Sequence, residues 1–174
     1  MSLLPSVRAT WAPRGKTPVL CHPYRRGRQI SMCGLLAYRH SDGDGEQVVA
    51  WMGFDLLEGA YDTRQFIRVL DGLGHQLGHQ PTTVIWDNLG AHHAGDLHAW
   101  AATQPWLELA YLPSYAPELD PVEGLWANLK GRELANRCCA DRAELIATAQ
   151  IGSIRARRDP DLLRSFLAGT GLTL

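Results

Sequence analysis

Two acidic residues stand where the chain around them would hold a carboxylate in a fixed position. Asp87 directly follows Thr82–Trp86, a short β-branched run typical of a strand buried on both faces. Glu123 comes three residues after Asp120, a predicted helix N-cap with Pro121 at the first helical position. Mg²⁺ prefers such carboxylate oxygens and takes one or two of them from a protein. The pair therefore favours a two-metal site for in-line phosphoryl displacement.

Each carboxylate also has an ordinary structural explanation. An aspartate at the end of a strand can cap the next turn with its own side chain, which would account for Asp87. Glu123 has the capping-box spacing from Asp120 and would then reach back to the cap N–H. In favour of a site, ligands of open α/β sheets bind at the carboxyl ends of strands. Position alone leaves both alternatives open for Asp87.

Residues beyond the two acids extend the candidate site toward nucleic acid. Trp126 and Lys130 share the helix face of Glu123, and Arg132 follows. Lys130 and Arg132 are predicted to contact phosphates, which position a nucleic acid without reading its sequence. Trp126 either lines the same groove or packs in the core. His92 is either a polar neighbour of the metal or an ordinary loop histidine, and no third ligand supports a zinc site.

The composition and net charge of the chain limit which functions are compatible with it. The chain has 174 residues, 45% of them apolar and 20% charged, which is typical of one globular domain. The formal net charge of −1 provides no global basic field. Local basic clusters are better explained as solvated surface charge. They comprise Arg25, Arg26 and Arg28, and then Arg155, Arg157, Arg158 and Arg164.

The cysteines and the hydropathy pattern bear on the compartment. The four cysteines form no C-x-x-C pair, which favours reduced thiols in a cytosolic protein. No stretch is apolar for long enough to span a membrane. We therefore expect a cytoplasmic protein without a membrane partner.

The hydrophobic pattern predicts elements that alternate along the chain, as in an α/β sheet domain with a helical C-terminal flank. The expected strands are residues 29–38, 47–54, 82–86 and 107–112. The expected helices are residues 62–77, 95–104, 121 to about 136, 141–155 and 160–167.

Two linked motifs carry a family resemblance. Residues 84–94 (VIWDNLGAHHA) and 111–134 (YLPSYAPELDPVEGLWANLKGREL) resemble D-D-E transposases of the mariner-like bacterial insertion-sequence group, the insertion-sequence-six-thirty family. That family places its second aspartate in V-x-x-D-N-x-x-x-H and its glutamate in L-P-x-Y-x-P-x-L-N-P-x-E-x-x-W-x-x-L-K. Asp120 replaces the usual asparagine. Positions 87 and 123 are 36 apart (123 − 87), a separation within the family range.

The resemblance implies a ribonuclease-H-like mixed sheet flanked by helices, with two Mg²⁺ ions (Mn²⁺ is an alternative) on three carboxylates. It implies cleavage at transposon ends and strand transfer into target DNA by a bacterial, nucleoid-associated enzyme. Asp87 and Glu123 then correspond to the second and third catalytic acids and metal ligands. With DNA as the partner, the residues expected to bind it are Asn88, His92, Trp126, Lys130 and Arg132.

The first acid of the family has no counterpart here. Its segment would immediately precede Ser2–Pro5, so we expect the first, central strand of the sheet to be missing. Residues 1–140 would form an N-terminally truncated catalytic domain, with residues 141–174 as its helical flank. We expect this chain alone to be inactive, because a metal pair on two carboxylates would be misplaced.

Two other functions remain possible alongside the transposase. The chain could be a non-catalytic remnant or interaction module that pairs, as a homodimer or with an intact transposase, through exposed strand edges. It could also be a different nuclease on the same fold, which would cleave DNA without strand transfer.

Overall fold

The strands form two separate pairs. The computed structural model describes residues 6–21, 30–40 and 48–173. β1 (Ser31–His40) pairs antiparallel with β2 (Val48–Leu57), and β3 (Thr82–Trp86) pairs parallel with β4 (Leu107–Tyr111). The predicted α/β class is confirmed, although the described strands stand in two two-stranded sheets. The predicted strand residues 29 and 47 and the cluster Arg25, Arg26 and Arg28 lie outside the described residues.

The predicted helices are all present. They are α1 (Thr63–Gln76), α2 (Gly95–Ala101), α3 (Pro121–Gly131), α4 (Arg142–Arg157) and α5 (Pro160–Gly169). Two short 3₁₀ turns, η1 (Gly90–His93) and η2 (Pro117–Leu119), precede α2 and α3. Aspartate side chains cap α1, α3, α4 and α5 by accepting backbone N–H bonds of the first turn, which satisfies donors that a helix start leaves unpaired.

Helix α3 is shorter than its sequence predicts. It ends at Gly131, not near Asn136. Asn136 adopts a left-handed φ of 53°, its N–H binds the carbonyl of Ser6, and its side chain bonds with the backbone of Arg8. Contacts with the start of the chain therefore replace the last expected helical turn.

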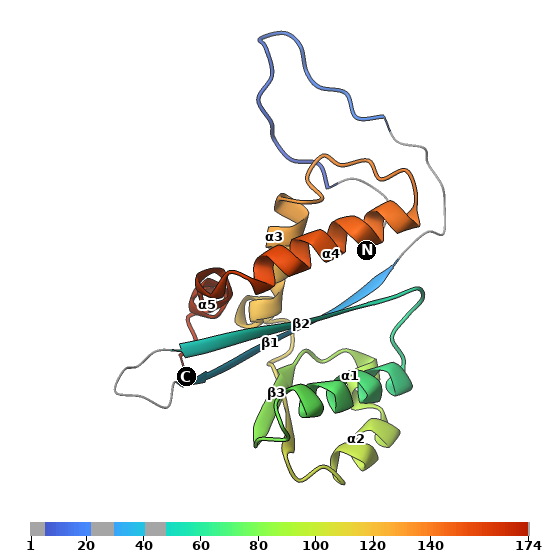
Figure 1. Ribbon diagram of the computed structural model, residues 1–174, viewed down its shortest axis with the longest axis vertical. Coiled ribbons are helices and arrows are strands. Elements are labelled where there is room, and N and C mark those ends of the chain that lie inside the picture. The colour runs from blue at the N-terminus through green and yellow to red at the C-terminus, as the bar shows by residue number, and fades with distance from the viewer. Residues whose placement is uncertain (1–5, 22–29, 41–47, 174) are drawn as a thin grey trace.

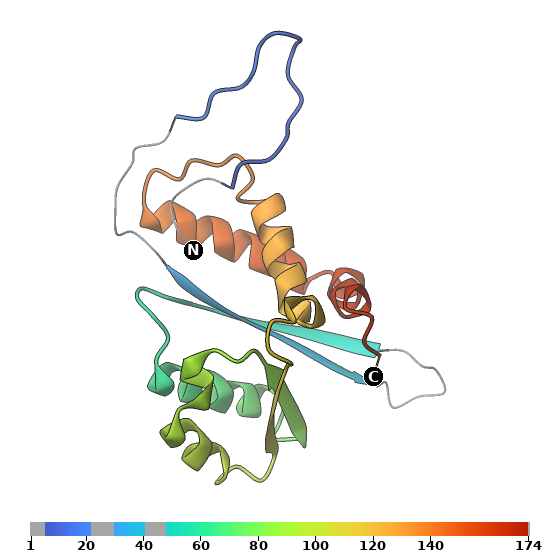
Figure 2. The same ribbon diagram turned by 180° about the vertical axis from the view of Figure 1, so that it is seen from behind.

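The β1–β2 hairpin lies between two groups of elements, as both ribbon views show (Figures 1 and 2). On one side α3, α4 and α5 pack on it around Met52, Leu125 and Leu163. On the other side, Leu35 and Trp51 of the hairpin join the core that α1 and α2 form with the β3–β4 pair. Both sheets thus share one apolar core, although no strand pairing joins them in the described residues.

The prediction that β3 is buried on both faces is wrong. Thr82, Val84 and Trp86 are half-buried, whereas Thr83 and Ile85 are exposed, and Ile85 keeps 59% of its surface accessible. Val84 and Trp86 pack in the core with α1 and α2, and no described element covers the opposite face of β3. A parallel strand normally has both faces covered, so this apolar face is unusual.

Candidate active site

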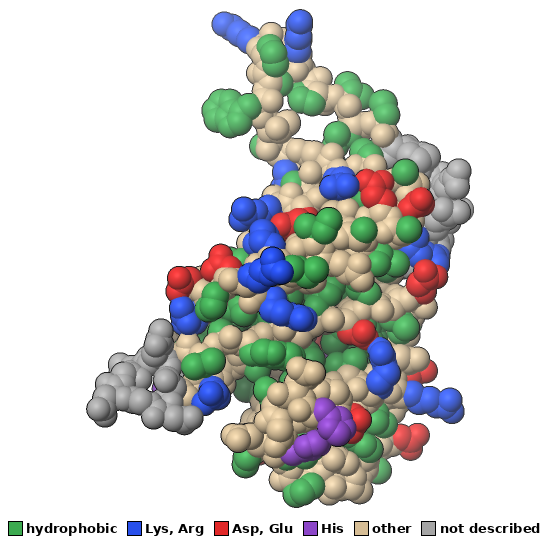
Figure 3. All heavy atoms as spheres, viewed as in Figure 1, with side chains coloured by type: hydrophobic (Ala, Val, Ile, Leu, Met, Phe, Trp, Pro, Cys, Tyr) green, Lys and Arg blue, Asp and Glu red, His purple; other side chains and the backbone are tan. Residues whose placement is uncertain are grey.

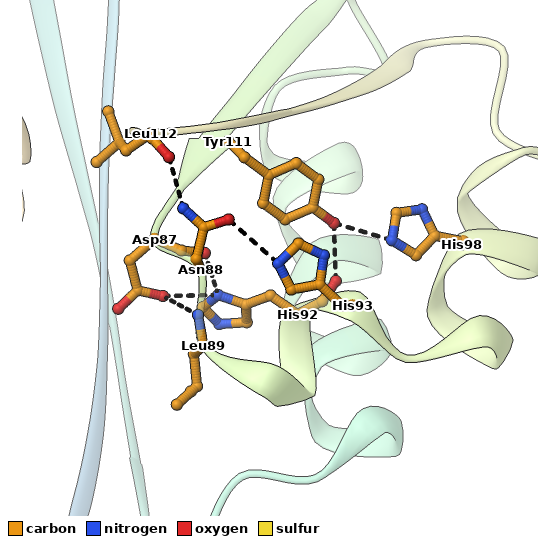
Figure 4. Close-up of polar contacts among 8 residues, drawn as sticks. All are labelled: Asp87, Asn88, Leu89, His92, His93, His98, Tyr111 and Leu112. Carbon is orange, nitrogen blue, oxygen red and sulfur yellow. Dashed lines mark hydrogen bonds and ion pairs between the residues drawn. The ribbon is translucent and has the colours of Figure 1, made fainter. Parts of the chain in front are cut away.

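Asp87 leaves one carboxylate oxygen free at the carboxyl end of β3 (Figure 4). Its Oδ1 accepts the N–H of Leu89 at 3.0 Å and lies 2.9 Å from Nδ1 of His92. No contact to Oδ2 is found among the described residues, and 63% of the side chain is exposed. The turn-capping explanation and the ligand explanation therefore apply to different oxygens of the same residue.

His92 is buried and holds Asp87 in place. Its ring stacks on Trp86 at 4.2 Å between centroids, with an interplanar angle of 4°. Its Nδ1 faces two acceptors of Asp87, Oδ1 at 2.9 Å and the carbonyl oxygen at 3.1 Å, so Nδ1 carries the proton. The hydroxyl of Tyr111 donates to the His92 carbonyl at 2.8 Å. These contacts assign His92 a positioning role.

Asn88 ties the end of β3 to the chain that leads to α3. Its Nδ2 donates to the carbonyl of Leu112 at 2.6 Å, and its Oδ1 lies 3.2 Å from Nε2 of His93 (Figure 4). The N–H of Leu112 in turn donates to the carbonyl of Trp86 at 2.9 Å. The segment that delivers Glu123 is thus anchored beside Asp87.

Glu123 is exposed in the first turn of α3 and does not complete a capping box. The N–H of Asp120, which a capping box would use, donates to the carbonyl of Pro117 at 3.1 Å. Asp120 itself caps α3, because its Oδ1 accepts the N–H of Val122 at 3.0 Å. Among the described residues no hydrogen bond or ion pair to the Glu123 carboxylate is found, so the capping explanation of Glu123 is wrong.

Asp120, the N-cap of α3, is half-buried and senses the charges of both predicted acids. Burial raises the pKa of Asp120 above its ordinary value, the N–H of Val122 lowers it, and the nearby charges of Glu123 and Asp87 raise it further. Asp87 and Glu123 therefore both lie within electrostatic reach of Asp120. Sequence reasoning treated Asp120 only as a cap. The signal was its charge at a position where the resembling family has asparagine.

The remaining predicted site residues divide into packed and exposed ones. Trp126 of α3 is half-buried against the core, with its ring 6.3 Å from that of Phe54. Lys130 is exposed in the last turn of α3, and Arg132 is the exposed residue after it. Lys130 is seven residues from Glu123, about 10 Å along the helix axis.

The donor atoms suit a hard divalent cation. Asp87 offers Oδ2 and Glu123 offers an exposed carboxylate, both of which are oxygen ligands that Mg²⁺ and Mn²⁺ accept. The described residues contain no group of three or more His, Cys, Asp or Glu residues placed to hold a metal ion. Further ligands would have to come from water, substrate or residues outside the described ranges.

The arrangement of helices and strands is that of a ribonuclease-H-like α/β fold. Its backbone is similar to that of a Mos1 strand transfer complex, with a TM-score of 0.55 and 16% identity over 96% of this chain and 51% of that one. It is equally similar to a Mos1 transposase paired-end complex with the left transposon end, with a TM-score of 0.54 and 15% identity over 94% and 50%. The chain therefore spans about half the length of these proteins.

Residues 2–146 match the sequence profile of the DDE superfamily endonuclease family. The chain belongs to that family. The search of curated proteins finds no match. No helix among the described residues is long and apolar enough to cross a membrane.

Proposed function

We propose that this chain is part of the catalytic domain of a transposase of the insertion-sequence-six-thirty branch, which cuts DNA at the ends of a mobile element and joins them to a target. One observation carries the proposal. Asp87 and Glu123, which the two motifs single out, come from distant elements, each has an oxygen without a protein partner in the described residues, and both act on Asp120.

In this proposal Asp87 and Glu123 hold Mg²⁺ or Mn²⁺. Such ions would supply the Lewis acidity that turns a water or a 3′-hydroxyl into a nucleophile, and the positive charge that stabilises a leaving oxygen. His92 keeps one Asp87 oxygen occupied, so that the other points outward. Asn88 and Trp126 fix the strand end and α3, while Lys130 and Arg132 contact phosphates. Asn88, His92 and Trp126 thus support the DNA-facing surface from beneath.

The site requires a third carboxylate, which we infer to lie on a strand between the two strand pairs. The two open strand pairs around one core support this, because a strand between them would complete a single mixed sheet. Residues 1–140 then belong to the catalytic domain, and residues 141–174 form its helical flank. We expect this chain to nick DNA weakly but measurably, and to act in the bacterial cytoplasm, at the nucleoid.

The exposed face of β3 favours a second candidate function, an interaction module. Ile85 lies on an uncovered strand face beside an open edge, and such edges pair readily with other chains. A second copy of this chain or an intact transposase would pair there, and the product would be an inhibitor without catalytic activity.

Metal-dependent nicking of supercoiled plasmid separates the two functions. For the enzyme we expect nicking with Mg²⁺ or Mn²⁺ that falls at least about 100-fold in Asp87→Asn and Glu123→Gln, because metal ions supply several kcal/mol of charge stabilisation. The matched control is Glu118→Gln, an exposed residue of η2. Co-purification with an intact transposase, without nicking, would support the interaction module. Nicking that Asp87→Asn leaves unchanged would contradict the catalytic proposal.

A further inference from the structure

The arginines of the C-terminal cluster differ in their partners. Arg155 donates from Nε to Glu133 at 2.6 Å and also contacts Asn128, and Arg164 pairs with Asp161. Arg157 and Arg158 are exposed at the end of α4, and no hydrogen bond or ion pair of either side chain is found in the described part of the chain. Two of the four charges are thus structural and two are available.

The packing of α4 against α3 places Arg157 and Arg158 beside the exposed cations at the end of α3. The Arg155–Glu133 pair joins α4 to the residue just past α3. Gly152 of α4 lies so close to α3 that an added Cβ would be 2.5 Å from Cδ2 of Leu129. The second half of α4 is therefore packed against the C-terminal end of α3. Four exposed cations flank this contact, and we call them the basic band: Lys130, Arg132, Arg157 and Arg158.

The acids near the basic band are engaged elsewhere. Glu133 is paired with Arg155, Asp161 is paired with Arg164, and Asp159 caps α5 by accepting the N–H of Leu162. Figure 3 shows Lys and Arg side chains gathered over the C-terminal part of α4. In a chain with a net charge of −1 this is a local concentration of positive charge.

Helix electrostatics explain only part of the basic band. Cations near a helix C-terminus are favoured by its partial negative charge, which accounts for Lys130 in α3 and Arg157 in α4. Arg132 and Arg158 lie past the last helical residues, where each helix already has its cation. The surplus fits an anionic partner whose charges repeat along a line, as DNA phosphates do.

We propose that the basic band binds the phosphate backbone of duplex DNA independently of sequence, with Arg157 and Arg158 as contacts that α4 adds to those of α3. The proposal rests on the proposed function only in taking DNA as the partner. A duplex on the band would pass about 10 Å along α3 from Glu123. Binding itself requires neither the carboxylates nor a metal.

Salt-dependent binding of the full chain to a short fluorescent duplex of random sequence tests the proposal. Anisotropy titrations in EDTA would run from about 50 to about 200 mM KCl. Arg157→Gln and Arg158→Gln should each lower the slope of log K against log salt by about one. Raising the salt over this range should therefore weaken DNA binding by the wild type about tenfold more than binding by the double variant. The control is Arg64→Gln, an exposed arginine of α1, which should keep the slope.

Two further measurements keep the outcome clear. Arg157→Lys and Arg158→Lys retain the charges and should retain the slope, since phosphate contact needs only a point charge. Thermal unfolding by circular dichroism reports any structural effect. Glutamine variants that lower the melting temperature but leave the salt slope unchanged would overturn the proposal in favour of a helix-dipole role. The two proposals can also fail separately. If the glutamine variants lose DNA affinity but Asp87→Asn does not reduce nicking, the basic band is upheld and the catalytic proposal is rejected.

Discussion

At the residue scale, the candidate site depends on which carboxylate oxygens of Asp87 are hydrogen-bonded and which are left without a partner. Oδ1 of Asp87 is occupied by Leu89 and His92, while Oδ2 has no protein partner in the described residues. The motif around Asp87 predicted a site residue. It did not predict the stacking of His92 on Trp86, because rings brought together by a turn leave no spacing signal. The pairing of His92 with Asp87 resembles the support that outer-sphere groups give to metal ligands.

Asp120 provides a pH test at this scale. Burial, followed by the charges of Glu123 and Asp87, raises the pKa of Asp120 in the fold, so the folded protein holds this proton more tightly than the unfolded chain. Stability therefore falls as pH rises from the unfolded pKa, about 3.9, through the raised folded pKa. Asp120→Asn keeps the cap and removes the charge. Without metal, the variant should be more stable than the wild type at pH 7.

Urea unfolding of both proteins measures this difference at pH 7 and again below the unfolded pKa. The advantage of Asp120→Asn should shrink at the lower pH, where Asp120 is protonated in both states of the wild type. An advantage of equal size at both pH values, or none at pH 7, would contradict the electrostatic account of Asp120.

At the element scale, helix starts were predictable and strand surroundings were not. Asp62, Asp120, Asp141 and Asp159 cap helices through local contacts that a sequence shows directly. Whether a face of β3 is covered depends on elements that are distant in the sequence. The hydrophobic residues of Thr82–Trp86 do not show which elements those are. The early end of α3 likewise depends on the contacts of Asn136 with Ser6 and Arg8. Arg8 is 128 residues away from Asn136 in the sequence.

The close contact between α3 and α4 gives a stability test. A Cβ on Gly152 would lie 2.5 Å from Cδ2 of Leu129 and 2.9 Å from Oε2 of Glu133. Overpacking of this kind costs about 1–3 kcal/mol, and the better helix propensity of alanine offsets about 1 kcal/mol. Gly152→Ala should therefore lower the free energy of unfolding by up to about 2 kcal/mol, measured by urea unfolding.

Gly72→Ala is the matched control within α1. A Cβ added at Gly72 would point into open space, with no described residue beyond its own helix backbone within 4 Å, so alanine should stabilise the helix by about 0.5–1 kcal/mol. If Gly152→Ala stabilised the chain to the same extent, the close packing of α3 against α4 would be contradicted.

At the scale of the whole molecule, the hairpin β1–β2 connects two groups of elements that carry different parts of the proposed function. The group with α1, α2 and the β3–β4 pair delivers Asp87, and the group with α3, α4 and α5 delivers Glu123 and the basic band. The two motifs predicted a DDE endonuclease, which the family match confirms, while Asp87 and Glu123 as its catalytic acids stay a prediction. The division of the strands into two pairs and the pairing of Arg155 with Glu133 could not be predicted, because they depend on tertiary packing.

Mn²⁺ binding to the full chain tests the central claim most directly, because it needs no active enzyme. Titrated Mn²⁺ should first broaden the amide signals of residues 87–89, 120 and 122–124. Asp87→Asn and Glu123→Gln should each weaken binding by about tenfold or more, the loss that even outer-sphere changes cause. Glu118→Gln should bind like the wild type. Broadening elsewhere in the chain, or equal affinity in all four proteins, would contradict a metal site formed by Asp87 and Glu123.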